Sequence, residues 1–242
     1  MTPAIDATST LGELVNTNPA LAAHLDEFGL DFCCGGHRSL VEAVAAAGID
    51  LDGVLAVLAA VDAEPDPGTV AWVEVGPIEM VDHLETTHHR YLSDTLPRVG
   101  ALVDKVAAVH SDRHPELVTV RSLFAELRAD LEPHLVKEER VLFPMIRELA
   151  TAATAPRFHC GTLANPIRVM LTEHDTAGDL LARLRAATAN YSVPADGCAS
   201  YHALYAALAE VEADTHLHVH KENNVLFPAV LATEAALARG TA

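Results

Sequence analysis

One motif occurs twice in this sequence, as HLVKEERVLFP beginning at His134 and as HVHKENNVLFP beginning at His218. Each copy places a glutamate, Glu138 or Glu222, four residues after its first histidine and closes on Val-Leu-Phe-Pro. Residues four apart on a helix project from the same face, so each glutamate points the same way as its histidine. Such a repeat predicts two helix pairs that are copies of one another, related by an approximate twofold axis.

Four long helical segments carry the two copies, and the sequence contains no strand-like alternation of apolar and polar residues. This pattern predicts an all-α protein. Short breaks rich in Gly, Pro, Ser and Thr separate the segments, which favours an antiparallel four-helix bundle. The Asn165-Pro166 pair is expected to cap the start of the third segment. The predicted segments are residues 77–110, 115–148, 166–190 and 198–238.

A smaller helical domain is expected at residues 1–62, joined to a bundle at residues 77–242 by a linker rich in proline and glycine at residues 63–76. Thr10 and Glu13 have the spacing of a capping box, which predicts that a helix begins there.

Three further features organise the small domain. Asn18-Pro19 is expected to cap a helix, and residues 49–61 are expected to form an apolar helix. Between these helices lies DFCCGG, in which Cys33 and Cys34 precede a pair of glycines. The glycine pair predicts a turn that presents two neighbouring thiols.

The two glutamates are expected on the inward face of the bundle, because apolar residues occupy the same face above and below them. His89 in the first segment and His174 in the third are flanked in the same way. Each helix therefore brings one inward histidine to a similar level. The apolar residues expected on the inward faces are Leu92, Leu96, Val99, Leu127, Leu131, Val141, Met145, Ile167, Met170, Leu181, Leu184, Leu204, Leu208, Val211, Val225 and Ala229.

An ionised glutamate inside a core is costly unless its charge is compensated, and two that face each other repel. A bound cation resolves both problems. If each glutamate bridges two ions, each ion receives two nitrogens and two oxygens, with positions left for an oxo or hydroxo bridge and an external ligand. This donor set favours iron or manganese over structural zinc, and we predict two iron ions. The predicted metal ligands are His89, His134, Glu138, His174, His218 and Glu222.

Other polar residues near these ligands receive weaker assignments. Glu85, Glu139 and Glu173 adjoin predicted ligands and could orient them, but a solvent-facing position is the favoured interpretation of each. The remaining histidines fall off the inward faces and are expected at the surface or in structural roles. They include His83, His88, His216 and His220, while His37, Cys160 and Cys198 receive no role from the sequence.

The composition excludes several classes of partner. Asp and Glu number 34 against 16 Lys and Arg, giving a formal net charge of -18 that repels nucleic-acid phosphates and anionic lipids. No apolar run is long enough to span a bilayer, and the first residues lack the pattern of a secretion signal, which favours a cytoplasmic protein. The four cysteines form neither a disulfide framework nor the paired spacing of a zinc site.

The series DFCCGG, a lone histidine, HxxxE, EHD and HxxxENNVLFP resembles the iron-sulfur cluster repair di-iron proteins, the RIC family. The resemblance covers nearly the whole chain and implies a small N-terminal domain followed by a hemerythrin-like bundle. It places the family's metal ligands on the six residues named above and its paired cysteines on Cys33 and Cys34. It also implies a cytoplasmic protein, often dimeric, that helps restore clusters damaged by nitric oxide or peroxide.

The leading hypothesis is repair of iron-sulfur clusters by donation or mobilisation of iron, with damaged iron-sulfur proteins or their apo forms as clients. Cys33 and Cys34 could then accept iron, reduce the centre or handle nitric oxide; the alternative is that they only pack in a buried turn. A second hypothesis is an enzyme, a nitric oxide reductase or denitrosylase. A third is a hemerythrin-like protein that binds or senses O2 or NO, although oxygen carriers have a fifth imidazole. An apolar outer helix face could serve a homodimer.

Overall fold

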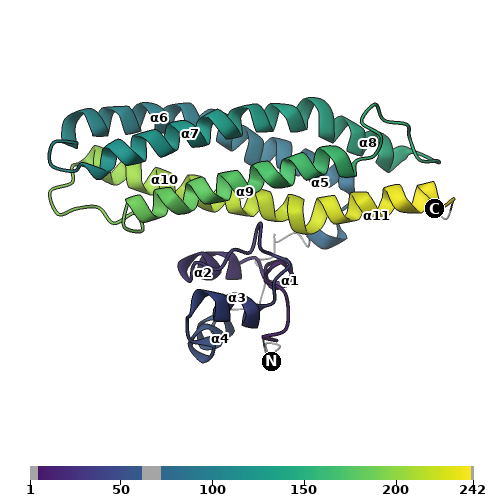
Figure 1. Ribbon diagram of the computed structural model, residues 1–242, viewed down its shortest axis with the longest axis horizontal. Helices are drawn as coiled ribbons and strands as arrows, with labels where there is room; N and C mark the ends of the chain where they lie inside the picture. The colour runs from purple at the N-terminus through teal and green to yellow at the C-terminus, as the bar shows by residue number, and fades with distance from the viewer. Residues whose placement is uncertain (1–4, 62–71, 241–242) are drawn as a thin grey trace.

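The computed structural model describes residues 5–61 and 72–240, and these residues form helices joined by turns, with no strand among them. The prediction of an all-α protein is therefore confirmed. Four short helices form an N-terminal unit, and four long rods lie side by side as a bundle against which this unit packs (Figure 1). The predicted linker, residues 63–76, lies mostly outside the described residues.

The N-terminal unit begins with the expected capping box. The Thr10 side chain accepts from the Glu13 backbone N–H, and the Glu13 carboxylate accepts from the Thr10 N–H. The expectation for Asn18 is wrong by two residues: the cap of the second helix is Ala20, and the Asn18 side chain accepts the Ala20 N–H. The helices are α1 (Leu11–Thr17), α2 (Leu21–Glu27), α3 (Leu40–Ala47) and α4 (Leu51–Ala59).

The four predicted long segments are all present as rods of the bundle. The third rod begins earlier than expected, because Leu163 is its cap, while the Asn165 side chain donates to the Cys160 carbonyl instead of capping. A short 3-10 helix, η1 (Trp72–Glu74), precedes the first rod. The rods comprise α5 (Pro77–Leu84), η2 (Glu85–His89) and α6 (Arg90–His110); α7 (Glu116–Lys137), η3 (Glu138–Leu142) and α8 (Phe143–Thr151); α9 (Ala164–Ala187); and α10 (Ala199–Lys221), η4 (Glu222–Leu226) and α11 (Phe227–Ala238).

Three of the rods contain a π-helical turn, and these turns correct the predicted inward face. Each such turn adds a residue to the helix, so the residues that follow are rotated by roughly 100° relative to a regular α-helix. Val141 and Ala229, expected inward, are exposed, and their neighbours Leu142 and Val230 are buried in their place. Val225, within a π turn, is partly buried, and the other predicted apolar positions of the rods are buried as expected.

The π turns lie between two apolar layers of the bundle. One layer gathers buried side chains from α6, α7, α9 and α10, among them Leu92, Leu131 and Leu181. The other gathers residues from α5, α8, α9 and α11, among them Phe143 and Phe227. The level between them is therefore sealed from water at both ends. Among the helices of the described residues, none has the length and hydropathy needed to cross a membrane.

The N-terminal unit docks on the fourth rod through polar contacts around a small apolar core. Asp26 pairs with His216 at 2.8 Å, the Asn16 side chain lies 3.0 Å from His220, and the Asn224 amide donates to the Cys33 carbonyl at 2.9 Å. His216 and His220 therefore have structural roles.

Gly36 provides a test of this docking. A Cβ atom at Gly36 would lie 2.5 Å from both the Asn224 side-chain oxygen and the Phe32 carbonyl. We expect Gly36→Ala to lower the free energy of unfolding by about 1–3 kcal/mol because the turn must move away from Asn224. The control is Gly76→Ala, where a Cβ atom would meet open space. Equal thermal unfolding of the two variants would contradict a close fit at this turn.

Candidate metal centre

Six titratable side chains from four rods meet at the level between the two apolar layers. His89 closes η2, Glu138 and Glu222 open η3 and η4, and His134, His174 and His218 lie on α7, α9 and α10. Each of the six is at most 1% exposed. The structure thus brings together all six residues that the sequence analysis proposed as ligands.

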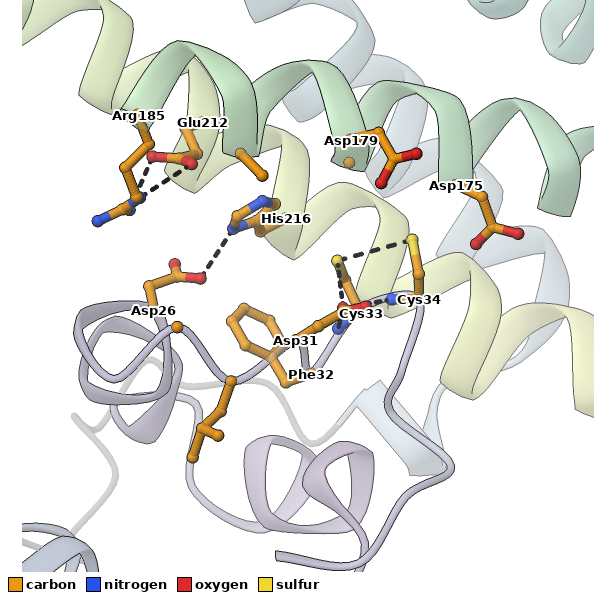
Figure 2. A pocket seen from close by; sticks show the side chains of 14 residues that line it. Asp26, Asp31, Phe32, Cys33, Cys34, Asp175, Asp179, Arg185, Glu212 and His216 are labelled. Atoms are coloured by element: carbon orange, nitrogen blue, oxygen red, sulfur yellow. Dashed lines mark hydrogen bonds and ion pairs between the residues drawn. The ribbon is translucent and has the colours of Figure 1, made fainter. Parts of the chain in front are cut away.

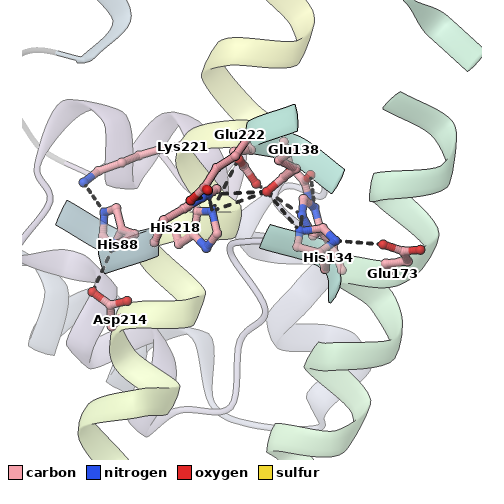
Figure 3. A network of polar contacts seen from close by, with 12 residues as sticks. His88, His134, Glu138, Glu173, Asp214, His218, Lys221 and Glu222 are labelled. Atoms are coloured by element: carbon pink, nitrogen blue, oxygen red, sulfur yellow. Dashed lines mark hydrogen bonds and ion pairs between the residues drawn. The ribbon is translucent and has the colours of Figure 1, made fainter. Parts of the chain in front are cut away.

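These side chains form two groups that share both glutamates (Figure 3). One contains His89 and His218, whose Nε2 atoms lie 3.2 Å apart, and the other contains His134 and His174, whose Nε2 atoms lie 3.1 Å apart. In each group the ligand atoms lie within 4.8 Å of one another. The π turns begin at Glu138 and Glu222, so each glutamate keeps the helical spacing to its histidine and only the residues that follow are shifted.

The donor atoms of this centre fit cations. Both carboxylate oxygens of Glu138 and of Glu222 are buried and have no hydrogen-bond partner in the described part of the chain. Three of the four histidines place Nδ1 against an acceptor oxygen, which leaves the lone pair of Nε2 directed at the glutamates. Lone pairs that face one another in a dry interior repel unless positive charge lies between them, so the residues suit a pair of metal ions.

The acceptors on Nδ1 revise the interpretation of two acidic residues. Glu139 lies 3.0 Å from Nδ1 of His89, and Glu173 lies 2.9 Å from Nδ1 of His134 and also pairs with Lys137. Glu139 is exposed, as expected, and Glu173 is half-buried, but both also orient the rings and make them stronger donors. Glu85 instead pairs with Arg147 across the first and second rods.

Asn223 is the functional residue that the sequence analysis missed. Its side-chain oxygen lies 2.8 Å from Nδ1 of His174. The repeat held a signal for it, because Asn223 follows Glu222 as Glu139 follows Glu138. In both copies of the motif, the residue after the glutamate orients a histidine from another rod: Glu139 orients His89, and Asn223 orients His174.

The thiols of the CCGG turn lie on the other side of Asn223. The Asn223 amide donates to the Cys33 carbonyl at 3.3 Å, and the Sγ atoms of Cys33 and Cys34 lie 3.9 Å apart. The hydrogen bond to Cys34, together with burial, raises the pKa of the Cys33 thiol well above its usual value. Cys160 and Cys198 are free thiols in other parts of the bundle, and His37 is exposed on the turn.

Comparison with known proteins now identifies the family. A model described as the hemerythrin HHE cation binding domain matches residues 80–230, and ScdA_N, a domain of unknown function, matches residues 7–62. The iron-sulfur cluster repair proteins YtfE of Musicola paradisiaca and Cronobacter sakazakii are 37% and 35% identical to this chain, covering 93% of it and 97% and 96% of themselves. A probable iron-sulfur cluster repair protein of Haemophilus influenzae is 35% identical over 93% of this chain and 97% of its own. The chain belongs to the iron-sulfur cluster repair family.

In this family member, the two groups of ligands have unequal surroundings. The rings of His134 and His174 each have an acceptor at Nδ1, and so does His89. Nδ1 of His218 is buried and has no partner among the described residues. Its neighbour is the ring of His88, which stacks on it at 5.5 Å. Of the two groups of ligands, the one that contains His89 and His218 therefore has fewer hydrogen bonds that orient its imidazoles.

His88 belongs to a buried polar cluster beside the centre (Figure 3). Its Nδ1 lies 2.8 Å from Asp214, and its Nε2 lies 2.8 Å from the Lys221 amine. The same amine lies 2.8 Å from His83 and 4.7 Å from the centre of the Trp72 ring. These contacts give His83 and His88 structural roles that tie the start of the first rod to the fourth.

The electrostatics of the metal-free centre favour ionised carboxylates. Burial alone would raise the pKa of Glu222, but the imidazoles of His218 and His174 hold it well below its ordinary value. The imidazoles of His134 and His89 likewise lower the pKa of Glu138. Burial alone would lower the pKa of His134, but the neighbouring carboxylates raise it to about 9. Two buried anions are thus balanced partly by protons on imidazoles.

Asn223→Ala should lower the affinity of the centre for metal by about 10–100-fold, because it removes the acceptor that orients His174. Glu139→Ala should lower it similarly through His89. The matched control is Arg140→Ala, an exposed residue beside Glu139, which should keep the affinity of the unmodified protein. Competition with a chromogenic chelator measures all three, and equal affinities would show that these acceptors do not support the ligands.

The metal affinity should depend on pH with a defined sign. His134, whose pKa is raised to about 9, carries a proton below that pH in the metal-free protein, and a cation must displace it. We therefore expect the affinity, corrected for the chelator, to rise between about pH 6 and about pH 9. A constant affinity over this range would contradict protonation of the empty centre.

Proposed function

We propose that this protein repairs iron-sulfur clusters damaged by nitrosative or oxidative stress, and that it does so by mobilising iron from a non-haem di-iron centre. The observation that carries the proposal is the pair of buried groups with two imidazoles each and both carboxylates in common. Neutral imidazole and carboxylate donors without thiolate favour iron or manganese at a centre of this kind. The relatives named as iron-sulfur cluster repair proteins support the same function.

The proposed ligands are His89 and His218 for one ion, His134 and His174 for the other, and Glu138 and Glu222 for both. When bound, two iron ions would supply a redox-active pair, bridged by oxo or hydroxo, with positions open to small molecules such as nitric oxide or O2. The side chains of Glu139, Glu173 and Asn223 hold the rings at fixed angles. The apolar layers above and below exclude water from the centre.

The partners follow from the repair role. Damaged iron-sulfur proteins, or their apo forms, are the proposed clients, and the proposed location is the cytoplasm. A homodimer is proposed as well. Cys33 and Cys34 are proposed to take part through their thiols, supported by their place at the docked turn, one asparagine side chain away from the ligand His174.

The experiment combines metal analysis, an absorption spectrum and a repair assay on a client whose cluster has been damaged by nitric oxide. We expect two irons per chain and an oxo-bridged charge-transfer band, both lost together with repair in Glu138→Ala. Cys33→Ser/Cys34→Ser should keep the iron and lose repair, while the control Cys160→Ser/Cys198→Ser should keep both.

Two outcomes would contradict the proposal. A centre that holds no iron would remove its chemical basis. Steady conversion of nitric oxide to nitrous oxide with an electron donor, and no repair of the client, would assign a nitric oxide reductase instead.

A further inference from the structure

The CCGG turn gathers a second set of metal-binding atoms outside the bundle centre. The ligand atoms of Asp31, Cys33 and Cys34 lie within 4.8 Å of one another. They border a pocket of about 400 Å³ between the N-terminal unit and helices α9 and α10 (Figure 2). None of the three belongs to the ligand set of the bundle centre.

The spacing of the two sulfurs already suits one cation. Two sulfurs bound at about 2.3 Å to a tetrahedral metal ion lie about 3.8 Å apart. The Sγ atoms of Cys33 and Cys34 are 3.9 Å apart, so both can bind one ion without a change in the backbone of the turn. The third atom, Oδ1 of Asp31, lies 3.2 Å from Sγ of Cys33 and accepts a hydrogen bond from its S–H group.

The backbone of the turn fixes the carboxylate in this position. Oδ1 of Asp31 accepts the N–H groups of Cys33 and Cys34 at 3.1 Å and 2.9 Å, and Oδ2 accepts the N–H of Gly35 at 2.9 Å. The side chain therefore needs no reordering when a cation replaces the thiol proton, which lowers the entropic cost of binding.

The pocket leaves a fourth position open. Cys34 and Gly178 of α9 both line this pocket of about 400 Å³, and a Cβ atom at Gly178 would only reach van der Waals contact with the sulfur, at 3.8 Å. Asp175 and Asp179, on the same helix, add negative charge to the wall of the pocket (Figure 2). Closed structural sites supply four protein donors, whereas three donors and an open position allow exchange of the fourth ligand.

We propose that Asp31, Cys33 and Cys34 form a second, exchangeable site for one thiophilic divalent cation. On binding, each thiol loses its proton to solvent, two metal–sulfur bonds form, and no electron is transferred. In the role that rests on the proposed repair function, the cation is ferrous iron, and a thiolate of the client takes the open position. The two sites share α9, because His174 belongs to the bundle centre and the next residue, Asp175, lines the pocket.

The test uses the full chain, with the bundle centre first saturated with iron, titrated with Co2+ in the absence of oxygen. We expect a thiolate-to-cobalt charge-transfer absorption that reaches its limit at one Co2+ per chain. Cys33→Ser/Cys34→Ser should lose this absorption, and the matched control Cys160→Ser/Cys198→Ser should retain it. No such absorption in the unmodified protein, or its persistence in Cys33→Ser/Cys34→Ser, would overturn the site.

A second measurement needs no substitution at the buried Cys33. Phenylarsine oxide joins two neighbouring thiols through two arsenic–sulfur bonds with release of water. Treated unmodified protein should keep its helical circular dichroism and its iron and lose the cobalt absorption, whereas an unchanged absorption after the arsenical has reacted would overturn the site. The iron content and client repair are measured on the same samples, so a failed repair function and a failed second site give different results.

Discussion

Two glutamates buried in one bundle are the constraint on which the rest of this structure depends. Glu138 and Glu222 are fully buried and face the same small space, where like charges repel most strongly. Four imidazoles surround them, and the apolar layers above and below keep water out. Such an arrangement is stable only when positive charge enters it. The need for that charge makes the four rods a metal-binding fold.

The two copies of the motif have diverged according to what each one faces. Val136 and Arg140 of the first copy are exposed, while the equivalent His220 and Asn224 of the second copy contact the N-terminal unit. The two copies therefore keep the same residues toward the centre and differ on the outside. One became a solvent-facing helix, and the other became the docking surface for the thiol-bearing turn.

The sequence was sufficient to predict the helices, the bundle and the convergence of six side chains, because the apolar residues that flank the proposed ligands follow helical spacing over most of each rod. It was not sufficient in the segments that follow the two glutamates. The π turns after Glu138 and Glu222 shift the phase, so Val141 and Ala229 were assigned to the wrong face. Local spacing also does not show which acceptor will meet a histidine from another rod. For that reason Asn223 was missed and Glu173 was undervalued.

One of the contacts between the two parts of the molecule also reaches the candidate metal centre. The oxygen of Asn223 holds the ring of His174, and its nitrogen holds the carbonyl of Cys33. Docking of the N-terminal unit and orientation of the His174 ring therefore depend on the same side chain. A movement of the thiol-bearing turn that takes the Asn223 side chain with it removes the acceptor from one imidazole of the buried centre.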